Sequence, residues 1–128
     1  MARILVAEDS LALSNLLQFV LTQAGHEPTI CRQGDKALEA AKKNQFDLLI
    51  FDQQMPRMTG LEVAEAVRKD SLNSSTPICL CTAKWHELDI ETIKSELSIS
   101  EILRKPFSPR DMVSLADRVI KEHSVTTG

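Results

Sequence analysis

Five side chains capable of phosphoryl chemistry stand at or just after the ends of short apolar runs. Glu8 and Asp9 directly follow one run and Asp52 follows another. Thr82 follows a third run, and Lys105 stands two residues after a fourth. If these runs are strands of one open parallel sheet, ligands bind outside their carboxyl ends. The sequence therefore predicts a polar site that combines three carboxylates, a hydroxyl and an ammonium group.

The chemistry of this set points to a metal ion and a phosphoryl group. Three carboxylates on neighbouring strands repel one another in a partly desolvated cleft, so the cluster needs a cation. Mg²⁺ suits oxygen ligands and accepts one or two protein carboxylates together with a phosphate oxygen. A carboxylate held beside such an ion can attack a phosphoryl group and form an aspartyl phosphate. Asp52 is the predicted nucleophile. Taken singly, each residue has a simpler interpretation: Asp52 caps a turn, and Lys105 neutralises surface carboxylates. The placement of all five residues at strand ends favours the site instead.

The elements that position these residues alternate between short apolar runs and segments of helical period, which is typical of βα units around a parallel sheet. Strands are expected at 4–7, 28–31, 48–51, 78–81 and 102–103. The first, third and fourth are continuously apolar, so we expect them in the centre, covered on both faces. Helices are expected at about 10–24, 35–43, 60–69, near 88–97 and after Pro109. The fourth has the weakest caps, because the serine-rich stretch after it lacks a terminating glycine.

Composition limits the chain to one ordinary globular domain. It has 128 residues, 43% hydrophobic and 26% charged, and a net charge of −3. This charge balance gives no excess of basic residues for binding nucleic acid or acidic lipid. No apolar run is long enough to span a bilayer. Three cysteines in apolar stretches indicate buried thiols in a reducing cytoplasm, not a zinc site. We expect the domain to cover 1–123 and a polar tail to cover 124–128.

Four motifs relate the chain to a known family. They are LVAEDS at 5–10, IFDQQMPRMTGLE at 50–62, CTA at 81–83 and RKPF at 104–107. In this order and spacing they resemble the receiver domain of bacterial two-component response regulators, in its single-domain, chemotaxis-regulator-like form. The resemblance implies a flavodoxin-like, doubly wound α/β fold with five parallel strands in the order 2-1-3-4-5 and five helices. It also implies a cis peptide bond before Pro106.

The resemblance further implies the roles of the site residues. Glu8, Asp9, Asp52 and the backbone carbonyl of Gln54 would hold Mg²⁺. Asp52 would be the phosphoacceptor, and its partners Thr82 and Lys105 would contact the phosphoryl oxygens.

The function so implied is a phosphorylatable signalling switch in the cytoplasm, with no enzymatic activity beyond its own phosphorylation and dephosphorylation. The phosphoryl group would come from a histidine kinase or a histidine phosphotransfer protein. Output would run through the fourth helix, fifth strand and fifth helix to an unknown protein target or to an effector domain outside this chain. The family's usual aromatic switch residue in the fifth strand is replaced by Ile102.

An alternative from another class is a Mg²⁺-dependent phosphohydrolase with an aspartyl-phosphate intermediate. Hydrolases of the haloacid dehalogenase type usually need a second acid two residues after the nucleophile. Gln54 stands at that position here.

Overall fold

The computed structural model describes the backbone of residues 2–127 and the side chains of residues 2–123. Within that part, one sheet of five parallel strands has the order β2-β1-β3-β4-β5, which confirms the expected flavodoxin-like order. The strands are β1 Arg3–Ala7, β2 Glu27–Cys31, β3 Leu48–Asp52, β4 Ile78–Thr82 and β5 Ile99–Arg104. The helices are α1 Leu11–Gln23, α2 Gly34–Lys43, α3 Gly60–Lys69, α4 Ile90–Leu97 and α5 Pro109–Thr127, with a 3₁₀ turn at Trp85–Glu87.

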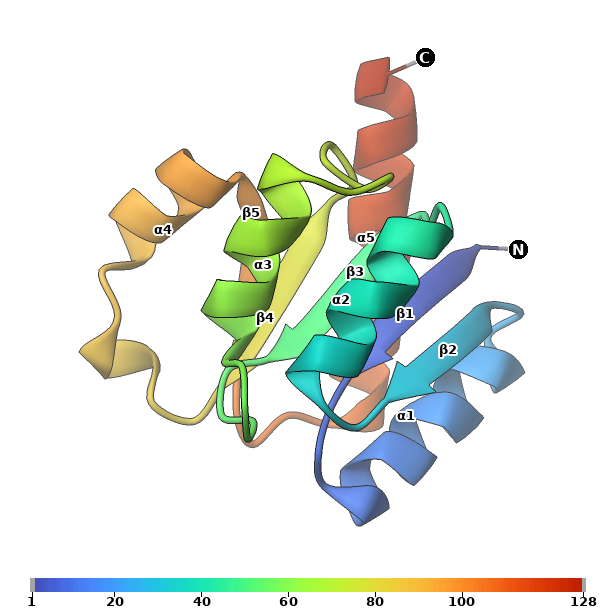
Figure 1. Cartoon of the computed structure of the whole chain (residues 1–128). Helices are drawn as coiled ribbons and strands as arrows, with labels where there is room; N and C mark the ends of the chain where they lie inside the picture. Colours follow the sequence, from blue (N-terminus) through green and yellow to red (C-terminus); the bar gives the residue numbers. More distant parts are fainter. Residues whose placement is uncertain (1, 128) are drawn as a thin grey trace.

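Helices cover both faces of the sheet (Figure 1). Alternate strand residues such as Leu5 and Leu49 pack in one core with α2 and α3, and α4 flanks this core with half-buried residues. Their neighbours Ile4 and Leu48 pack in a second core with α1 and α5. Because side chains alternate across a strand, a strand covered on both faces must be apolar at every position.

The burial of the strands follows their place in the sheet. Every residue of β3 and β4 is buried, and β1 is buried after its first residue. The edge strands β2 and β5 are mostly half-exposed. The three continuously apolar runs therefore form the centre of the sheet, as predicted, and their carboxyl ends lie side by side.

Local signals in the sequence account for the beginnings of the helices next to the site. The Ser10 hydroxyl caps α1 by accepting a hydrogen bond from the Leu13 N–H at 3.3 Å. Thr59 and Glu62 form a capping box at the start of α3, which satisfies backbone N–H groups that have no partner within the helix. Gly25, with φ +92°, adopts the left-handed conformation after α1.

The fifth strand is longer than predicted. The sequence indicated a strand only at 102–103, whereas β5 begins at Ile99, which pairs with Ile78 and is 3% exposed. Ser100 and Glu101 belong to the strand because an edge strand leaves polar side chains half-exposed to solvent. Their polarity concealed the strand from a search for apolar runs.

The expectation that α4 is poorly capped was wrong. The Asp89 carboxylate accepts hydrogen bonds from the Thr92 N–H at 3.3 Å and the Thr92 hydroxyl at 2.8 Å. Ser98, with φ +53°, takes the left-handed position usually given to glycine. Arg68 of α3 then donates to the carbonyls of Leu97 at 2.8 Å and Ser98 at 3.1 Å. A side chain distant in sequence therefore satisfies carbonyls at the end of α4.

The expected polar tail lies at the end of α5. The backbone helix continues to Thr127, while the side chains of 124–128 lie outside the described residues. No helix in the described part of the chain is long and apolar enough to cross a membrane.

Candidate functional site

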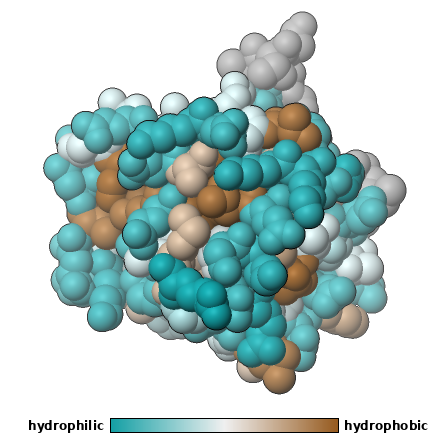
Figure 2. Space-filling view, in the orientation of Figure 1, coloured by the Kyte–Doolittle hydropathy of each residue, from teal (hydrophilic) through white to brown (hydrophobic). Residues whose placement is uncertain are grey.

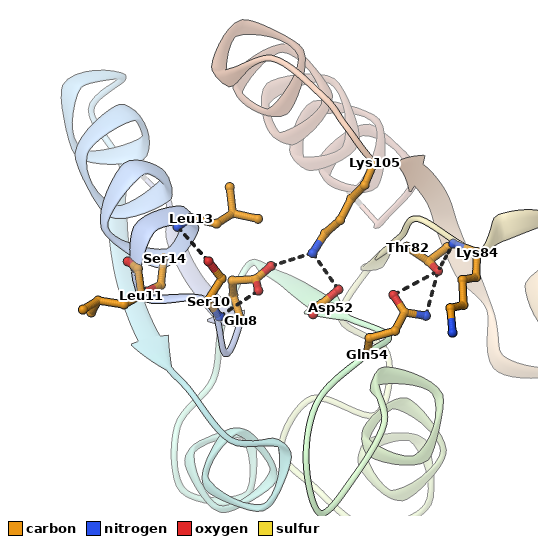
Figure 3. Close-up of polar contacts among 10 residues, drawn as sticks. All are labelled: Glu8, Ser10, Leu11, Leu13, Ser14, Asp52, Gln54, Thr82, Lys84 and Lys105. Atoms are coloured by element: carbon orange, nitrogen blue, oxygen red, sulfur yellow. Dashed lines mark hydrogen bonds and ion pairs between the residues drawn. The ribbon is translucent and has the colours of Figure 1, made fainter.

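Three carboxylates meet at the carboxyl edge of the sheet. Glu8 and Asp9 follow β1, and Asp52 is the last residue of the neighbouring β3. One carboxylate oxygen from each lies within 4.8 Å of the others. The structure thus brings together the three acids that the sequence singled out. Figure 3 shows Glu8 and Asp52 directed toward the same point.

Lys105 enters the cluster from the loop after β5. Its Nζ lies 2.9 Å from Asp52 Oδ1 and 3.1 Å from Glu8 Oε1, as Figure 3 shows. Both carboxylates are 3% exposed and the lysine side chain is 21% exposed, so these ion pairs are largely desolvated. The backbone N–H of Lys105 donates to the Thr82 carbonyl at 2.9 Å. The Lys105–Pro106 peptide bond is cis, as predicted from the family resemblance.

Burial controls the protonation of the two inner acids. Desolvation raises the pKa of Asp52 above its ordinary value, and the charge of Asp9 raises it further, although Lys105 acts in the opposite direction. Desolvation likewise raises the pKa of Glu8. Burial alone would lower the pKa of Lys105, but Asp52 and Glu8 raise it overall. The single positive charge of Lys105 therefore does not fully offset the burial and mutual repulsion of the carboxylates in this cluster.

The cluster fits a hard divalent cation. Asp52 Oδ1 is buried and, apart from the ion pair with Lys105, has no hydrogen-bond partner among the described residues. The donor set consists of carboxylate oxygens, the ligands that Mg²⁺ prefers. The second oxygen of Glu8 is held by the Ser10 N–H at 3.1 Å, which orients this carboxylate. Such an ion would offset the like-charge repulsion that raises the pKa of both buried acids.

The N-terminal end of α3 packs directly against the main chain at Asp52. A Cβ placed on Gly60 would lie 2.6 Å from the Asp52 carbonyl oxygen and 2.7 Å from Leu80 Cδ1. Only glycine allows this approach of helix to strand. The Gln53 side chain accepts a hydrogen bond from the Leu61 N–H at 2.9 Å. The position of the Asp52 loop is thus tied to the start of α3, a constraint that no sequence pattern revealed.

Thr82 is close to the cluster, but its hydroxyl has other partners. Gln54 Nε2 donates to Thr82 Oγ1 at 3.0 Å, and Thr82 Oγ1 donates to Gln54 Oε1 at 3.3 Å. The Lys84 N–H also donates to the hydroxyl at 3.0 Å. Sequence reasoning assigned Gln54 a backbone role and did not foresee this side-chain contact. Nothing in the sequence indicates that a glutamine and a threonine 28 residues apart form a hydrogen bond.

A second contact missed by sequence reasoning supports the acidic loop. Arg32, which follows β2, donates from its guanidinium group to the Asp9 carbonyl at 3.2 Å. This bond links the loop after β1 to the loop after β2. Because an exposed arginine has many possible partners, its type and position alone did not indicate this role.

Comparison with known proteins places this fold and site in a family. The model of the response regulator receiver domain matches residues 4–117. The chain belongs to the response regulator receiver domain family.

Two curated relatives are about twice as long as this chain. The alkaline phosphatase synthesis transcriptional regulatory protein PhoP of Bacillus subtilis is 30% identical over 123 residues, which cover 96% of this chain and 50% of that protein. The DNA-binding response regulator MtrA of Mycobacterium tuberculosis is 32% identical over 112 residues, which cover 88% of this chain and 47% of that protein. The chain therefore spans about half the length of these curated relatives.

Two solved chains match this chain over almost their whole length. The chemotaxis protein CheY4 of Vibrio cholerae superposes with a TM-score of 0.84 at 33% identity, covering 93% of this chain and 98% of that one. The receiver domain of the sensor histidine kinase PA1611 of Pseudomonas aeruginosa superposes with a TM-score of 0.83 at 22% identity, covering 94% and 98%. That structure has a magnesium ion coordinated in its active-site cleft. At this identity the second match shows a shared fold.

Proposed function

We propose that this chain is a phosphorylatable signalling switch whose phosphoacceptor is Asp52. The observation that carries the proposal is the 3%-exposed Asp52 carboxylate, held 2.9 Å from Lys105 in a cluster of three acids. In the transfer, an Asp52 oxygen forms a bond to phosphorus while the phosphorus–nitrogen bond of a phosphohistidine breaks. The electron pair of that bond leaves with the histidine of the donor. The donor is a histidine kinase or a histidine phosphotransfer protein.

Mg²⁺ is the proposed cofactor. Glu8, Asp9, Asp52 and the backbone carbonyl of Gln54 would hold the ion, which supplies positive charge beside the transferring phosphoryl group. The magnesium in the cleft of the PA1611 receiver domain supports this choice of metal. Lys105 is placed to neutralise phosphoryl oxygens, and Thr82 to donate a hydrogen bond to one of them.

The phosphodonor is proposed to dock on α1 and the loop after β5. Helix α1 contains no charged residue, and its Leu16 and Phe19 are 40% and 61% exposed. Leu13 and Phe107 line a hollow that also includes Lys105. This apolar surface therefore borders the acidic cluster, and exposed apolar surface of this kind is typical of protein contacts. A donor bound here would bring its phosphohistidine within reach of Asp52.

Output is proposed to run through α4, β5 and α5. No residue of α4 is fully buried, and Ile90, Ile93 and Ile102 are half-exposed. Figure 2 shows hydrophobic surface beside α4. At the end of β5 the Arg104 guanidinium stacks 3.8 Å from the centre of the Trp85 ring, which joins this surface to the loop after Thr82. The target is a protein partner or an effector domain; two of the longer relatives are described as a transcriptional regulatory protein and a DNA-binding regulator.

Mass spectrometry after incubation with acetyl phosphate and Mg²⁺ tests the proposal. The wild-type protein is expected to gain one phosphoryl mass that is lost in base, and Asp52→Asn to gain none. Asp70→Asn is the matched control, because Asp70 is exposed and follows the far end of α3. Uptake by Asp52→Asn at the wild-type rate would disprove the assignment.

A further inference from the structure

The hydroxyl of Thr82 has no free hydrogen-bonding capacity in this structure. A threonine hydroxyl offers one proton and two acceptor lone pairs. Both acceptor positions are used, by Gln54 Nε2 and the Lys84 N–H, each at 3.0 Å. The single proton is directed at Gln54 Oε1, 3.3 Å away. Figure 3 shows this group of contacts beside Asp52 and separate from the Glu8–Lys105–Asp52 ion pairs.

A phosphoryl group on Asp52 would compete for that one proton. Phosphoryl oxygens only accept hydrogen bonds, so Thr82 can bind one only by donating its proton. That proton must first leave Gln54 Oε1. Thr82 is fully buried and paired with Arg104 in the sheet, and its carbonyl is held by the Lys105 N–H. Its backbone is therefore anchored, and rotation of the side chain is the available movement.

We propose that the Gln54 carboxamide is a latch that holds the Thr82 hydroxyl away from the phosphoryl site of Asp52. Gln54 acts as a positioning residue, through Thr82, and the latch rests on the proposed function of Asp52 as phosphoacceptor. The exchange replaces a neutral amide acceptor by an anionic one, and hydrogen bonds to charged groups are the stronger kind. Release is thus favoured only when the phosphoryl group is present.

Release of the latch also changes the loop that leads to α4. The Lys84 N–H loses the hydroxyl acceptor that closes the turn after β4. The 3₁₀ turn Trp85–Glu87 follows immediately and precedes α4. Rotation of one side chain therefore frees the backbone at the start of the segment that connects the site to the proposed output surface. No aromatic rotation at Ile102 is needed for this step.

The cost of opening the latch lowers the affinity of the protein for a phosphoryl group. Removing the carboxamide should therefore tighten the binding of beryllofluoride, a phosphoryl mimic, by roughly three- to tenfold, the effect of a typical net hydrogen bond. Gln54→Met keeps the length of the side chain and removes its hydrogen-bonding atoms. Gln54 is exposed, so the substitution should leave the fold intact.

A double-mutant cycle tests the latch. Wild type, Gln54→Met, Thr82→Val and the double variant are titrated with beryllofluoride at saturating Mg²⁺, with Trp85 emission and ¹⁵N spectra as readouts. The latch predicts tighter binding by Gln54→Met in the Thr82 background and no change in the Thr82→Val background. The affinity for Mg²⁺ alone is measured for all four proteins, so that a change in metal binding is separated from a change in beryllofluoride binding. Without beryllofluoride, Gln54→Met should shift the Lys84 amide resonance and the Thr82 side-chain couplings.

Three results would overturn the latch. Equal tightening in both backgrounds would mean that Gln54 acts on the phosphoryl group or the metal directly. Unchanged or weaker binding by Gln54→Met, with a wild type that binds normally, would show that the contact does not restrain Thr82. Gln54→Ala repeats the test with a shorter side chain, and its beryllofluoride affinity must change in the same direction as that of Gln54→Met. Failure of the wild type to bind beryllofluoride with Mg²⁺ would overturn the proposed function and the latch with it.

Discussion

The substitution Asp52→Asn separates two opposing electrostatic effects in the acidic cluster. In wild type, Asp52 is attracted by Lys105 at 2.9 Å and repelled by two carboxylates with oxygens within 4.8 Å. At an effective dielectric constant of about 20, the attraction is about 6 kcal/mol and the two repulsions, taken at the 4.8 Å limit, are together about 7 kcal/mol. These contributions nearly cancel. The loss of hydration of a carboxylate that is 3% exposed then decides the sign.

We therefore expect Asp52→Asn to stabilise the metal-free protein at pH 7. Lys105 keeps Glu8 as a partner at 3.1 Å, so the substitution leaves no unpaired buried ammonium. The expected gain in unfolding free energy is about 1–3 kcal/mol, within the range of about 1–4 kcal/mol found when buried ion pairs are replaced by uncharged residues of similar volume. For a domain of this size it corresponds to an increase in Tm of roughly 3–10 °C.

The contribution of these two acids to folding stability changes with pH in the opposite direction to that of a typical ion-paired Asp or Glu. Burial raises the pKa of Asp52 and Glu8 in the folded state above their ordinary values. The folded protein therefore binds these protons more tightly than the unfolded chain, and this contribution to stability rises as pH falls from 7 toward the raised pKa values. This contribution reaches its full size below the ordinary pKa values of Asp and Glu, where the carboxylates of the unfolded chain are protonated as well. Asp52→Asn should reduce this rise.

Urea unfolding in EDTA, repeated with Mg²⁺, measures these effects. Mg²⁺ at about one hundred times its Kd should stabilise wild type by about 2.7 kcal/mol, and Asp52→Asn should gain less. Asp70→Asn, an exposed control, should change stability by no more than about 0.5 kcal/mol. If Asp52→Asn were less stable than wild type in EDTA at pH 7, the attraction of Lys105 would outweigh desolvation and the reasoning would be refuted.

Three further substitutions or probes test the packing around the site. Gly60→Ala should lower unfolding free energy by about 1–3 kcal/mol and slow phosphorylation by acetyl phosphate, because its Cβ would lie 2.6 Å from the main-chain oxygen of Asp52, the proposed phosphoacceptor; wild-type stability would contradict this. Asn73→Ala should cost about 2–4 kcal/mol in urea unfolding, because the fully buried side chain binds two carbonyls at 2.7 Å and one backbone N–H at 2.8 Å; a loss below about 1 kcal/mol would refute that role. In the native protein Ellman's reagent should modify only Cys31, since burial raises the pKa of Cys79 to about 12 and also that of Cys81; fast reaction of a second thiol would contradict the burial.

The site residues could be found from the sequence because each lies at or just after the end of a strand. Asp52 and Thr82 end strands that are buried at every residue, so the apolar runs located them directly. The strand order came from the family motifs, since periodicity carries no information about which strands are neighbours. Lys105 follows a weaker run, and its direction toward Asp52 depends on contacts in three dimensions.

The contacts that sequence reasoning missed join residues far apart in the chain. Arg68 satisfies carbonyls 29 and 30 residues away at the end of α4, where no local cap was visible. Gln54 reaches Thr82 across 28 residues. Side chains of these types are usually exposed and can bond to many partners. Their partners are set by how α3, β4 and α4 pack, and a local pattern does not contain that packing.

The charges of the cluster explain why a neutral hydroxyl should respond to phosphorylation. Three carboxylates, one ammonium group and a divalent ion would together be neutral. Phosphorylation would replace the charge of Asp52 by about −1.5 to −2, so a pocket balanced by Mg²⁺ and Lys105 would become negative again. A further donor is then favoured, and the Thr82 hydroxyl has a proton held only by a neutral carboxamide at 3.3 Å. The movement of Thr82 would therefore follow from the charge imbalance that phosphorylation creates and that Mg²⁺ binding alone does not.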